Sequence, residues 1–150
     1  MILKICKAVI KVLMGLFMVF AGTGHLTYAR QEFIAQVPVW IQFTPGFTDF
    51  VVLASGVVEI LLGLAMLSLW KGRSGWAGAA LAIFYVLIFP GNINQYVEHI
   101  NAFGLDTDQA RLIRLLFQPV LIFFALWSTN GWSTLKTWWN ACAGMFKKSR

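Results

Sequence analysis

Long apolar stretches alternate with short polar segments along the chain. Four apolar stretches stand out, at about residues 8–28, 50–70, 76–96 and 112–129. Each contains roughly 18 to 21 residues, which at a rise of about 1.5 Å per residue matches the hydrocarbon core of a bilayer, about 30 Å thick. Because an unbroken helix satisfies the backbone hydrogen bonds of such a stretch in lipid, the pattern predicts four transmembrane helices.

The first stretch has a second interpretation. Lys4, Lys7 and Lys11 precede an apolar run that is followed by small residues, which is also the pattern of a secretory signal peptide. The helical pattern continues through Gly22 and His25, however, without a clear cleavage site between small residues. We therefore expect this helix to be retained.

The last segment, residues 132–150, is aromatic and basic. Its apolar residues recur at spacings of three and four, at Trp132, Leu135, Trp139, Cys142 and Phe146. With Lys136, Lys147 and Lys148 around this stripe, the segment predicts a helix that lies on the inner leaflet of the membrane. A frayed basic tail is the alternative.

Composition supports a membrane protein. The chain is 59% hydrophobic and 12% charged, with a mean hydropathy of +0.71, so it has too little polar material to cover a soluble domain. It contains no linker, no low-complexity segment and no convincing internal repeat. We expect one all-α domain over residues 1–150, an integral membrane bundle of four transmembrane helices with an interfacial C-terminal helix.

The distribution of charge predicts the orientation, because cytoplasmic segments retain Lys and Arg. With the N-terminus inside, nine of the twelve basic residues fall on the cytoplasmic side: Lys4, Lys7, Lys11, Lys71, Arg73, Lys136, Lys147, Lys148 and Arg150. The outer loops hold the acidic residues Glu32, Asp49, Glu98, Asp106 and Asp108. Tryptophan clusters at the inner interface, at Trp70, Trp76, Trp127, Trp132, Trp138 and Trp139. We expect a multi-pass protein of the cell (inner) membrane with both termini cytoplasmic. Its charge of +6 would face the membrane surface, and nucleic acid is not an expected partner.

Cysteine and metal chemistry are not indicated. Cys6 and Cys142 lie near the reducing cytoplasmic side and form no Cys-x-x-Cys pair, which disfavours a membrane thiol oxidoreductase. The two histidines, His25 and His99, belong to no cluster with metal-ligand spacing. No metal site is therefore expected.

Polar residues inside the apolar stretches mark a candidate site, because a buried ionisable group in lipid costs several kcal/mol. Counted from the inner ends at about 1.5 Å per residue, one polar level lies roughly 17 to 24 Å deep, in the outer half of the bilayer. It contains His25, Glu59, Asn92, Arg114 and Gln118. Bundle cores build ligand sites from such facing side chains, so these five are the candidate ligand-binding residues. No catalytic residue is assigned.

Each ionisable member also has a structural interpretation. Glu59 can form an ion pair with Arg114 or His25 that only fixes the register of the helices. His25 can accept a proton or bond a ligand carbonyl, or it can simply bridge two helices. Arg111 and Arg114 can extend to the outer head groups, and of the two we expect Arg111 to be the more exposed.

The two amides have structural interpretations as well. Asn92 follows Pro90 and Gly91, where the helix can break, and its amide can serve to satisfy the freed backbone groups. Gln118 precedes Pro119 and can do the same in the last apolar stretch. Small residues such as Gly91 beside the polar level would let the helices approach closely.

Five short motifs occur in order along the chain. They are GHL ending the first apolar stretch, VPVWIQFTPG in the first outer loop, SGVVEILLGLAML in the second stretch, IFPGNINQY in the third and RLIRLLFQP in the fourth. Together, over about residues 15 to 128, they resemble the DoxX family of small bacterial membrane proteins. The sequence departs at Leu26, where the family commonly has an aromatic residue, and at Gly91, where it often has Ala. The resemblance implies a four-helix membrane bundle, and named relatives are associated with quinone-linked sulfur oxidation and terminal quinol oxidase complexes.

Two functions from different classes agree with these features. The first is binding of a small amphipathic molecule, a quinone or a lipid, at the polar level, in a subunit of a membrane redox complex or in a homo-oligomer. The second is a non-catalytic assembly or partner protein whose polar level is structural. An intramembrane Glu and His would also suit a proton channel or transporter, although an inverted repeat is missing. No cofactor motif occurs, quinone is the one cofactor suggested, and catalysis is left open.

Overall fold

The computed structural model describes residues 1–68 and 73–148, with side chains up to residue 144. The described residues form helices and no strand. The elements are α1 (Ile2–Leu26), α2 (Arg30–Gln36), the 3-10 turn η1 (Val39–Ile41), α3 (Pro45–Leu67), α4 (Ser74–Val97), α5 (Asp108–Thr129) and α6 (Gly131–Lys148). Trp70, Lys71 and Arg150, used above to predict the orientation, lie outside the described residues, as do the side chains of Phe146, Lys147 and Lys148.

Each of the four apolar stretches coincides with a long helix. These helices are α1, α3, α4 and α5, and the predicted helical tail is α6. Three of them, α3, α4 and α5, are long and apolar enough to cross a membrane. The all-α class is therefore confirmed, and the three apolar helices indicate a protein embedded in a membrane.

Side-chain caps fix where two of the apolar helices begin. The Thr44 hydroxyl accepts a hydrogen bond of 3.1 Å from the Phe47 N–H at the start of α3. Thr107 does the same for the Ala110 N–H at the start of α5, at 3.2 Å. Such caps satisfy backbone donors that the first turn of a helix leaves free. α5 ends at Asn130, whose left-handed conformation (φ 60°) turns the chain directly into α6.

α4 runs unbroken through Pro90, a residue at which the sequence allowed a break. A proline inside a helix removes one backbone hydrogen bond and crowds the preceding turn, and polar side chains of neighbouring helices can compensate. Pro90 leaves the Val86 carbonyl without its helical partner, and Gln118 Nε2 of α5 donates at 2.8 Å to the adjacent carbonyl, that of Tyr85. Pro119 likewise lies inside α5, which also continues without interruption.

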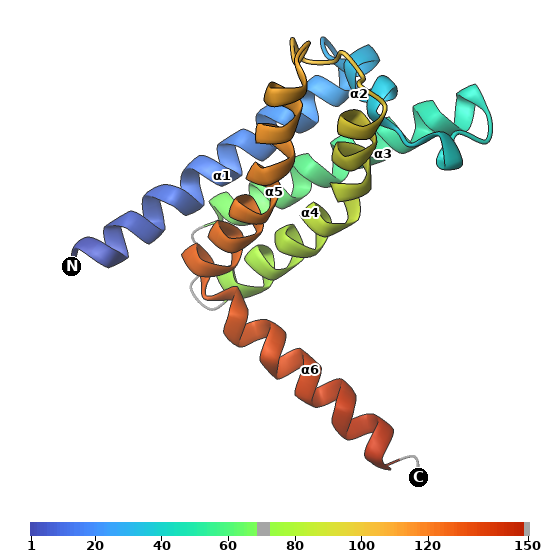
Figure 1. Ribbon diagram of the computed structural model, residues 1–150. Coiled ribbons are helices and arrows are strands. Elements are labelled where there is room, and N and C mark those ends of the chain that lie inside the picture. Colours follow the sequence, from blue (N-terminus) through green and yellow to red (C-terminus); the bar gives the residue numbers. More distant parts are fainter. Residues whose placement is uncertain (69–72, 149–150) are drawn as a thin grey trace.

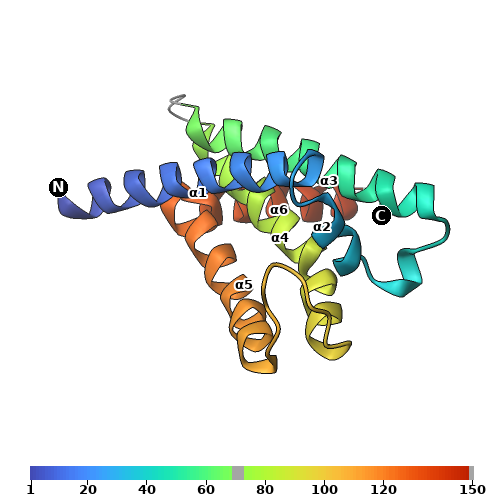
Figure 2. The same cartoon turned by 90° about the horizontal axis from the view of Figure 1, so that it is seen from above.

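The long helices form two antiparallel pairs. α1 packs most extensively against α3, and α4 against α5 (Figure 1). α5 also contacts α1, while α3 contacts α4, so the two pairs close into one bundle (Figure 2). α2 lies across the end of the bundle near the C-terminus of α1 and contacts α1, α3 and α4. α2 therefore covers the end of the bundle at which the candidate site lies.

Glycine pairs bring the backbones of α1 and α3 into contact. Gly15 faces Gly63, and Gly22 faces Gly56, and the two glycines of each helix are seven positions apart. A methyl group added at Gly22 would lie 2.5 Å from the Gly56 carbonyl oxygen, and one added at Gly63 would lie 2.7 Å from the Gly15 carbonyl oxygen. Because these atoms belong to the backbone, they cannot move aside as a flexible side chain would. Small residues at such a spacing are the usual device for close helix packing in membranes.

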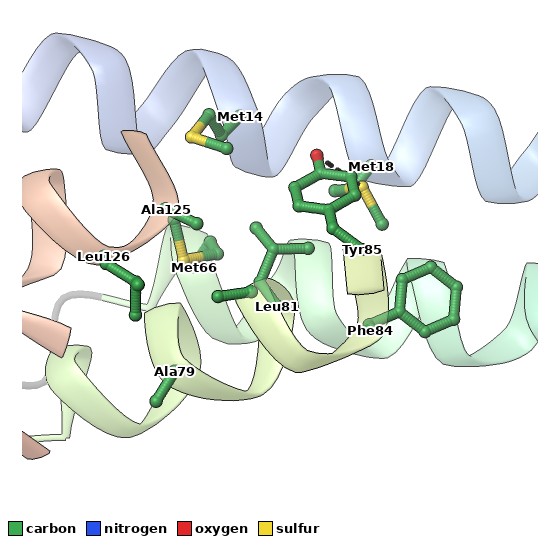
Figure 3. Packing of buried hydrophobic residues seen from close by; sticks show 10 residues of the cluster. Met14, Met18, Met66, Ala79, Leu81, Phe84, Tyr85, Ala125 and Leu126 are labelled. Carbon is green, nitrogen blue, oxygen red and sulfur yellow. Dashed lines mark hydrogen bonds between the residues drawn. The ribbon is translucent and has the colours of Figure 1, made fainter. Parts of the chain in front are cut away.

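A methionine-rich core fills the space between the two pairs on the inner side of the candidate site. Met14 and Met18 of α1 and Met66 of α3 pack with Leu81 and Tyr85 of α4 (Figure 3). The Tyr85 hydroxyl points at the Met18 sulfur, 3.2 Å away. Flexible thioether side chains fill the gaps left between helices that cross at an angle.

The C-terminal helix α6 extends away from the bundle (Figure 1). Its contacts are with α4 and α5, near its start. Trp132, Trp138 and Trp139 are all exposed along it. The interior of the bundle is therefore formed by α1, α3, α4 and α5 without the tail.

Replacing Gly56 by Ala tests the backbone contact. The new methyl group would lie 2.5 Å from the His25 Cβ and 2.9 Å from the Gly22 carbonyl oxygen, so α1 and α3 must separate. Overpacking of this kind costs about 1–3 kcal/mol, and we expect a correspondingly lower midpoint of unfolding in detergent. Gly46→Ala is the control, because no atom lies within 4 Å of its added methyl group. Equal midpoints for the two variants would contradict the proposed role of the glycine pairs.

Candidate functional site

A buried histidine–glutamate pair joins α1 to α3. His25 Nε2 lies 3.2 Å from Glu59 Oε1, and the two residues are 6% and 4% exposed. His25 lies in the last turn of α1 and Glu59 in the middle of α3, and the antiparallel packing places them at one level. Of the two partners considered for Glu59, the structure places His25 beside it and puts Arg114 in a different set of contacts. The carboxyl group thus has a polar neighbour that offsets part of the cost of its burial.

The second ring nitrogen of His25 is held by α3. Its Nδ1 lies 3.1 Å from the Val52 carbonyl oxygen and 3.0 Å from the Ser55 hydroxyl. Ser55 itself donates to the Val52 carbonyl at 2.9 Å. A carbonyl oxygen only accepts, so the tautomer with a hydrogen on Nδ1 suits the Val52 contact and turns Nε2 toward Glu59. These contacts hold the imidazole in position.

Two atoms of this pair lack a hydrogen bond. Glu59 Oε2 is fully buried without a partner, and His25 Nε2, although close to Oε1, is not aligned for a hydrogen bond. Buried polar atoms are nearly always satisfied in native proteins. An unpaired carboxylate oxygen inside a membrane-embedded bundle is therefore the strongest indication of a binding site in the described residues.

An aromatic column leads from His25 to the loop between α4 and α5. The Phe33 ring of α2 stacks on the imidazole with ring centres 3.3 Å apart, and Phe103 packs edge-on against Phe33 at 4.6 Å. The Arg114 guanidinium lies 4.8 Å from the centre of the Phe103 ring, within the range of a cation–π contact. The column covers the His25–Glu59 pair on the side of α2.

Glutamine side chains connect α2 to α4 and α5. Gln36 Nε2 donates to Gln95 Oε1 at 2.5 Å, and Gln36 Oε1 accepts from Arg114 at 3.1 Å. Gln95, which is 1% exposed, also lies within hydrogen-bond distance of the Ala102 carbonyl. Arg114 is therefore half-buried at the end of the bundle, where its partners are an amide of α2 and an aromatic ring of the α4–α5 loop.

The two predicted amides bond to each other. Asn92 Nδ2 donates to Gln118 Oε1 at 2.9 Å, and Gln118 Nε2 donates to the Tyr85 carbonyl. The Tyr85 phenol is close enough to Glu59 to interact with it electrostatically, and it donates to the Met18 sulfur. Tyr85 thus links the amide pair to the ionisable pair. The five predicted residues lie in three adjacent contact groups rather than in a single cluster.

The pattern of apolar and polar residues did not identify several residues of the site. Phe33 and Phe103 looked like ordinary apolar residues of the loops, Gln36 lay outside every apolar stretch, and Tyr85 fitted the core. Gln95 sits within the IFPGNINQY motif, three residues after Asn92 and so on the same side of α4. That helical spacing was the one available indication.

Arg111 is buried, which corrects the expectation that it is the more exposed of the two arginines. Its side chain is 5% exposed and donates to Asn101 Oδ1, the Leu105 carbonyl and Asp108 Oδ1, each at 2.7 Å. The loop between α4 and α5 leaves carbonyl oxygens that need donors, and a planar guanidinium can satisfy several of them at once. Arg111 therefore holds this loop in place.

A second arginine holds α2 on the bundle. Arg30 forms a two-point ion pair with Asp49 of α3, in which Nε donates to Oδ1 at 2.7 Å. The hydrogen bond with Asp49 raises the pKa of Arg30. On the same helix, Glu32 accepts a hydrogen bond of 2.7 Å from the backbone N–H of Phe103. These contacts join α2 and the α4–α5 loop into a lid over the site.

Side chains that bind metal ions are scattered over the described part of the chain. No group of three His, Cys, Asp or Glu side chains comes together there. The two cysteines are free, Cys6 exposed on α1 and Cys142 half-buried on α6. The chemistry of the site is therefore that of one carboxyl group, one imidazole and their apolar surroundings.

Comparison with known families identifies the family of this chain. A family model described as a domain of unknown function, DUF8561, matches residues 14–129. The chain belongs to this family. The matched segment runs from the middle of α1 to the end of α5 and includes every site residue, whereas α6 lies beyond it. No curated protein and no solved structure matches the chain.

The amide pair generates a stability prediction. In Gln118→Leu, the Asn92 amide loses its acceptor and stays buried, so we expect unfolding to be easier by about 1–3 kcal/mol. The double variant Asn92→Leu/Gln118→Leu removes both partners and should recover part of that loss. Chemical unfolding in detergent of the wild type, Gln118→Leu, Asn92→Leu and the double variant gives the coupling energy between the two amides. Strictly additive losses would show that the two amides do not act as a pair.

Proposed function

We propose that the chain crosses the membrane four times, with α1 as the fourth span and both termini in the cytoplasm. The support comes from three large apolar side chains of α1, those of Leu13, Phe17 and Phe20, which are exposed. Such a surface along a helix fits lipid better than water. The three lysines near the N-terminus of α1 would then meet cytoplasmic head groups of the cell (inner) membrane.

The tail helix α6 would lie on the inner leaflet. Trp132, Trp138 and Trp139 are exposed on it, and Lys136 lies among them in the sequence. Tryptophan rings favour the interface between head groups and hydrocarbon, and lysine favours anionic head groups. Since α6 starts directly after α5, the inner end of the bundle is where this contact would be made.

In this membrane, the function that the geometry supports best is binding of a small amphipathic molecule, a quinone or a lipid, at His25 and Glu59. The observation that carries it is the buried Glu59 Oε2, which has no partner among the described residues. A polar group of the ligand would satisfy this oxygen. Its apolar part would remain in contact with the surrounding hydrophobic side chains and lipid.

The five predicted site residues then take different roles. Glu59 would contact the ligand, and His25 would hold the carboxyl group in place. Asn92 and Gln118 already satisfy each other, so they would position α4 against α5. Arg114 would anchor the lid through Gln36.

The resemblance to the DoxX family supports a redox context for this binding site. The motifs that carry the resemblance include His25, Glu59, Asn92 and Gln118, all of which are buried here at the outer end of the bundle. A subunit of a membrane redox complex would use such a site to hold a lipid-soluble carrier. This assignment remains part of the proposal, together with the identity of the partner subunits.

A structural role is the second candidate, and one observation favours it. The amides of Asn92, Gln118, Gln36 and Gln95 form hydrogen bonds with one another or with neighbouring groups, as a purely stabilising network would. A non-catalytic assembly protein would need nothing more. Glu59 distinguishes the two candidates, because only the binding function requires its free oxygen.

Glu59→Ala should remove the bound molecule. A hydrogen bond to a charged group contributes about 1.5–3 kcal/mol, so we expect at least about a tenfold loss of any quinone or lipid enriched in extracts of the purified protein. Mass spectrometry of the extracts compares the wild type with Glu59→Ala and with Glu98→Ala, a carboxylate control at the exposed end of α4. Extracts that match the bulk membrane for all three proteins would favour the structural role.

The orientation can be tested with the two native cysteines. Cys6 and Cys142 should both lie in the cytoplasm, so a membrane-impermeant maleimide should label neither in intact spheroplasts and should reach the exposed Cys6 after permeabilisation. Asp106→Cys, in the exposed outer loop, should be labelled without permeabilisation. Labelling of the wild type in intact cells would reverse or reject the four-span topology.

A further inference from the structure

We infer that the connection between α2 and α3 inserts its aromatic side chains into the membrane, at the boundary between head groups and hydrocarbon. This segment, the aromatic arm, comprises residues 38–47 and contains nearly all of the VPVWIQFTPG motif. Its partner is the lipid of the leaflet at the end of the bundle that carries α2. The inference rests on the proposed membrane crossing, but it depends neither on the orientation of the chain nor on the ligand site.

The arm projects from the bundle with its large apolar side chains uncovered. Figure 1 shows the connection between α2 and α3, with the first turn of α3, reaching beyond the other helices, and Figure 2 shows the same from above. Val39, Trp40 and Phe43 are each more than two-thirds exposed. A cluster of exposed apolar side chains of this size is typical of a surface that contacts a membrane or another protein.

Local contacts hold the arm in this exposed position. Gln42 Nε2 donates to the carbonyl of the buried Val37 at 2.6 Å. The Thr44 side chain caps α3, and the Phe43 ring packs against Phe47 with ring centres 5.3 Å apart. The rings are therefore presented by a folded segment, so little conformational entropy is lost when they enter lipid.

The exposed side of α3 connects the arm to the membrane-embedded part of this helix. One apolar stripe follows α3 at spacings of three and four, which keeps its residues on one face. Apart from the half-buried Ala54, its members are exposed: Phe47, Phe50, Ala54, Val57, Leu61 and Leu64. Since α3 is long and apolar enough to cross a membrane, lipid covers this face. The continuity between the arm and this face favours lipid over a protein as the partner of the arm.

The length of the stripe places the arm at the membrane boundary. Phe47 and Leu64 are seventeen positions apart, which corresponds to about 26 Å along the helix. The hydrocarbon core is about 30 Å thick, so a stripe that fills most of it has Phe47 near one edge. Trp40 and Phe43 come before the helix and fall at the level of the head groups, where aromatic rings are enriched.

The arm is uncharged, which decides the kind of lipid surface that it fits. The sequence has no charged residue between Glu32 and Asp49. The tail helix α6 differs, because Lys136 lies among its tryptophans and favours anionic head groups. Aromatic and apolar contact alone would insert the arm, and this contact is available equally in neutral and in anionic membranes.

Nitroxide labels measure the depth of the arm. The full chain with Cys6→Ser and Cys142→Ser carries one label, at Phe43→Cys, Leu61→Cys or Asp106→Cys, in phosphatidylcholine nanodiscs. Collisions with oxygen, which concentrates in lipid, are compared with collisions with a nickel chelate, which stays in water. We expect the ratio of oxygen to nickel collisions at Phe43→Cys to be several-fold above that at Asp106→Cys, which lies exposed in the α4–α5 loop, and to approach that at Leu61→Cys. Adding phosphatidylglycerol should leave this ratio unchanged.

The other outcomes identify what fails. A ratio at Phe43→Cys equal to that at Asp106→Cys places the arm in water and overturns the inference, while a lipid value at Leu61→Cys leaves the membrane crossing intact. A label at Phe43→Cys that is immobile and shielded from both reagents means that a protein covers the arm, and a ratio that rises only with phosphatidylglycerol means that charge attracts it. Either result overturns the inference. A water value at Leu61→Cys rejects the proposed crossing itself.

A second site protects the experiment against a folding defect. Val39→Cys lies on the same arm and is equally exposed, so its label should give the same ratio as the one at Phe43→Cys. Thermal unfolding of each labelled variant in detergent checks that the bundle is intact. A difference between the two sites, with one in lipid and the other in water, would show that the arm as a whole is not inserted.

Discussion

The contact between the backbones of α1 and α3 is the constraint from which the rest of the site follows. Gly15 and Gly22 face Gly63 and Gly56 so closely that no Cβ fits between the helices. This packing brings the last turn of α1 against the middle of α3 and places the His25 ring against the Val52 carbonyl and Glu59. Without side chains at these glycines, the energy of association comes from van der Waals contact over a long, close interface, which is the means available inside lipid.

The close packing also determines the electrostatics of the site. A carboxyl group in hydrocarbon needs a polar partner, and His25 provides one whose orientation is fixed by α3 itself. Val52, Ser55 and Glu59 belong to one helix, so the imidazole is held between groups whose spacing hardly changes. The pair therefore places Oε1 beside the imidazole and leaves Oε2 without a hydrogen-bond partner among the described residues.

The other polar groups isolate this pair from the outer surface. Phe33 stacks on His25, Phe103 packs on Phe33, and Arg114 lies over Phe103, so two aromatic rings lie between the imidazole and the guanidinium. Hydrogen bonds among amides and the guanidinium hold these rings in place without using the free oxygen of Glu59. A lid assembled in this way makes the surroundings of the carboxyl group apolar, which strengthens any hydrogen bond formed there.

The sequence alone determined the all-α class, the positions of the long helices and the helical tail, and it predicted a common level for His25, Glu59, Asn92, Arg114 and Gln118. It could do so because lipid imposes length and composition on a spanning helix, and because depth follows from counting residues along it. Tertiary structure decided which of these groups touch. From the sequence, Glu59 had two possible partners, and Arg111 was expected to be the more exposed of the two arginines. Nothing in the sequence indicated that Phe33 and Phe103 belong to the site. Pairing depends on helix rotation and on the path of the outer loops, and these follow from packing between distant segments that counting along one helix does not reveal.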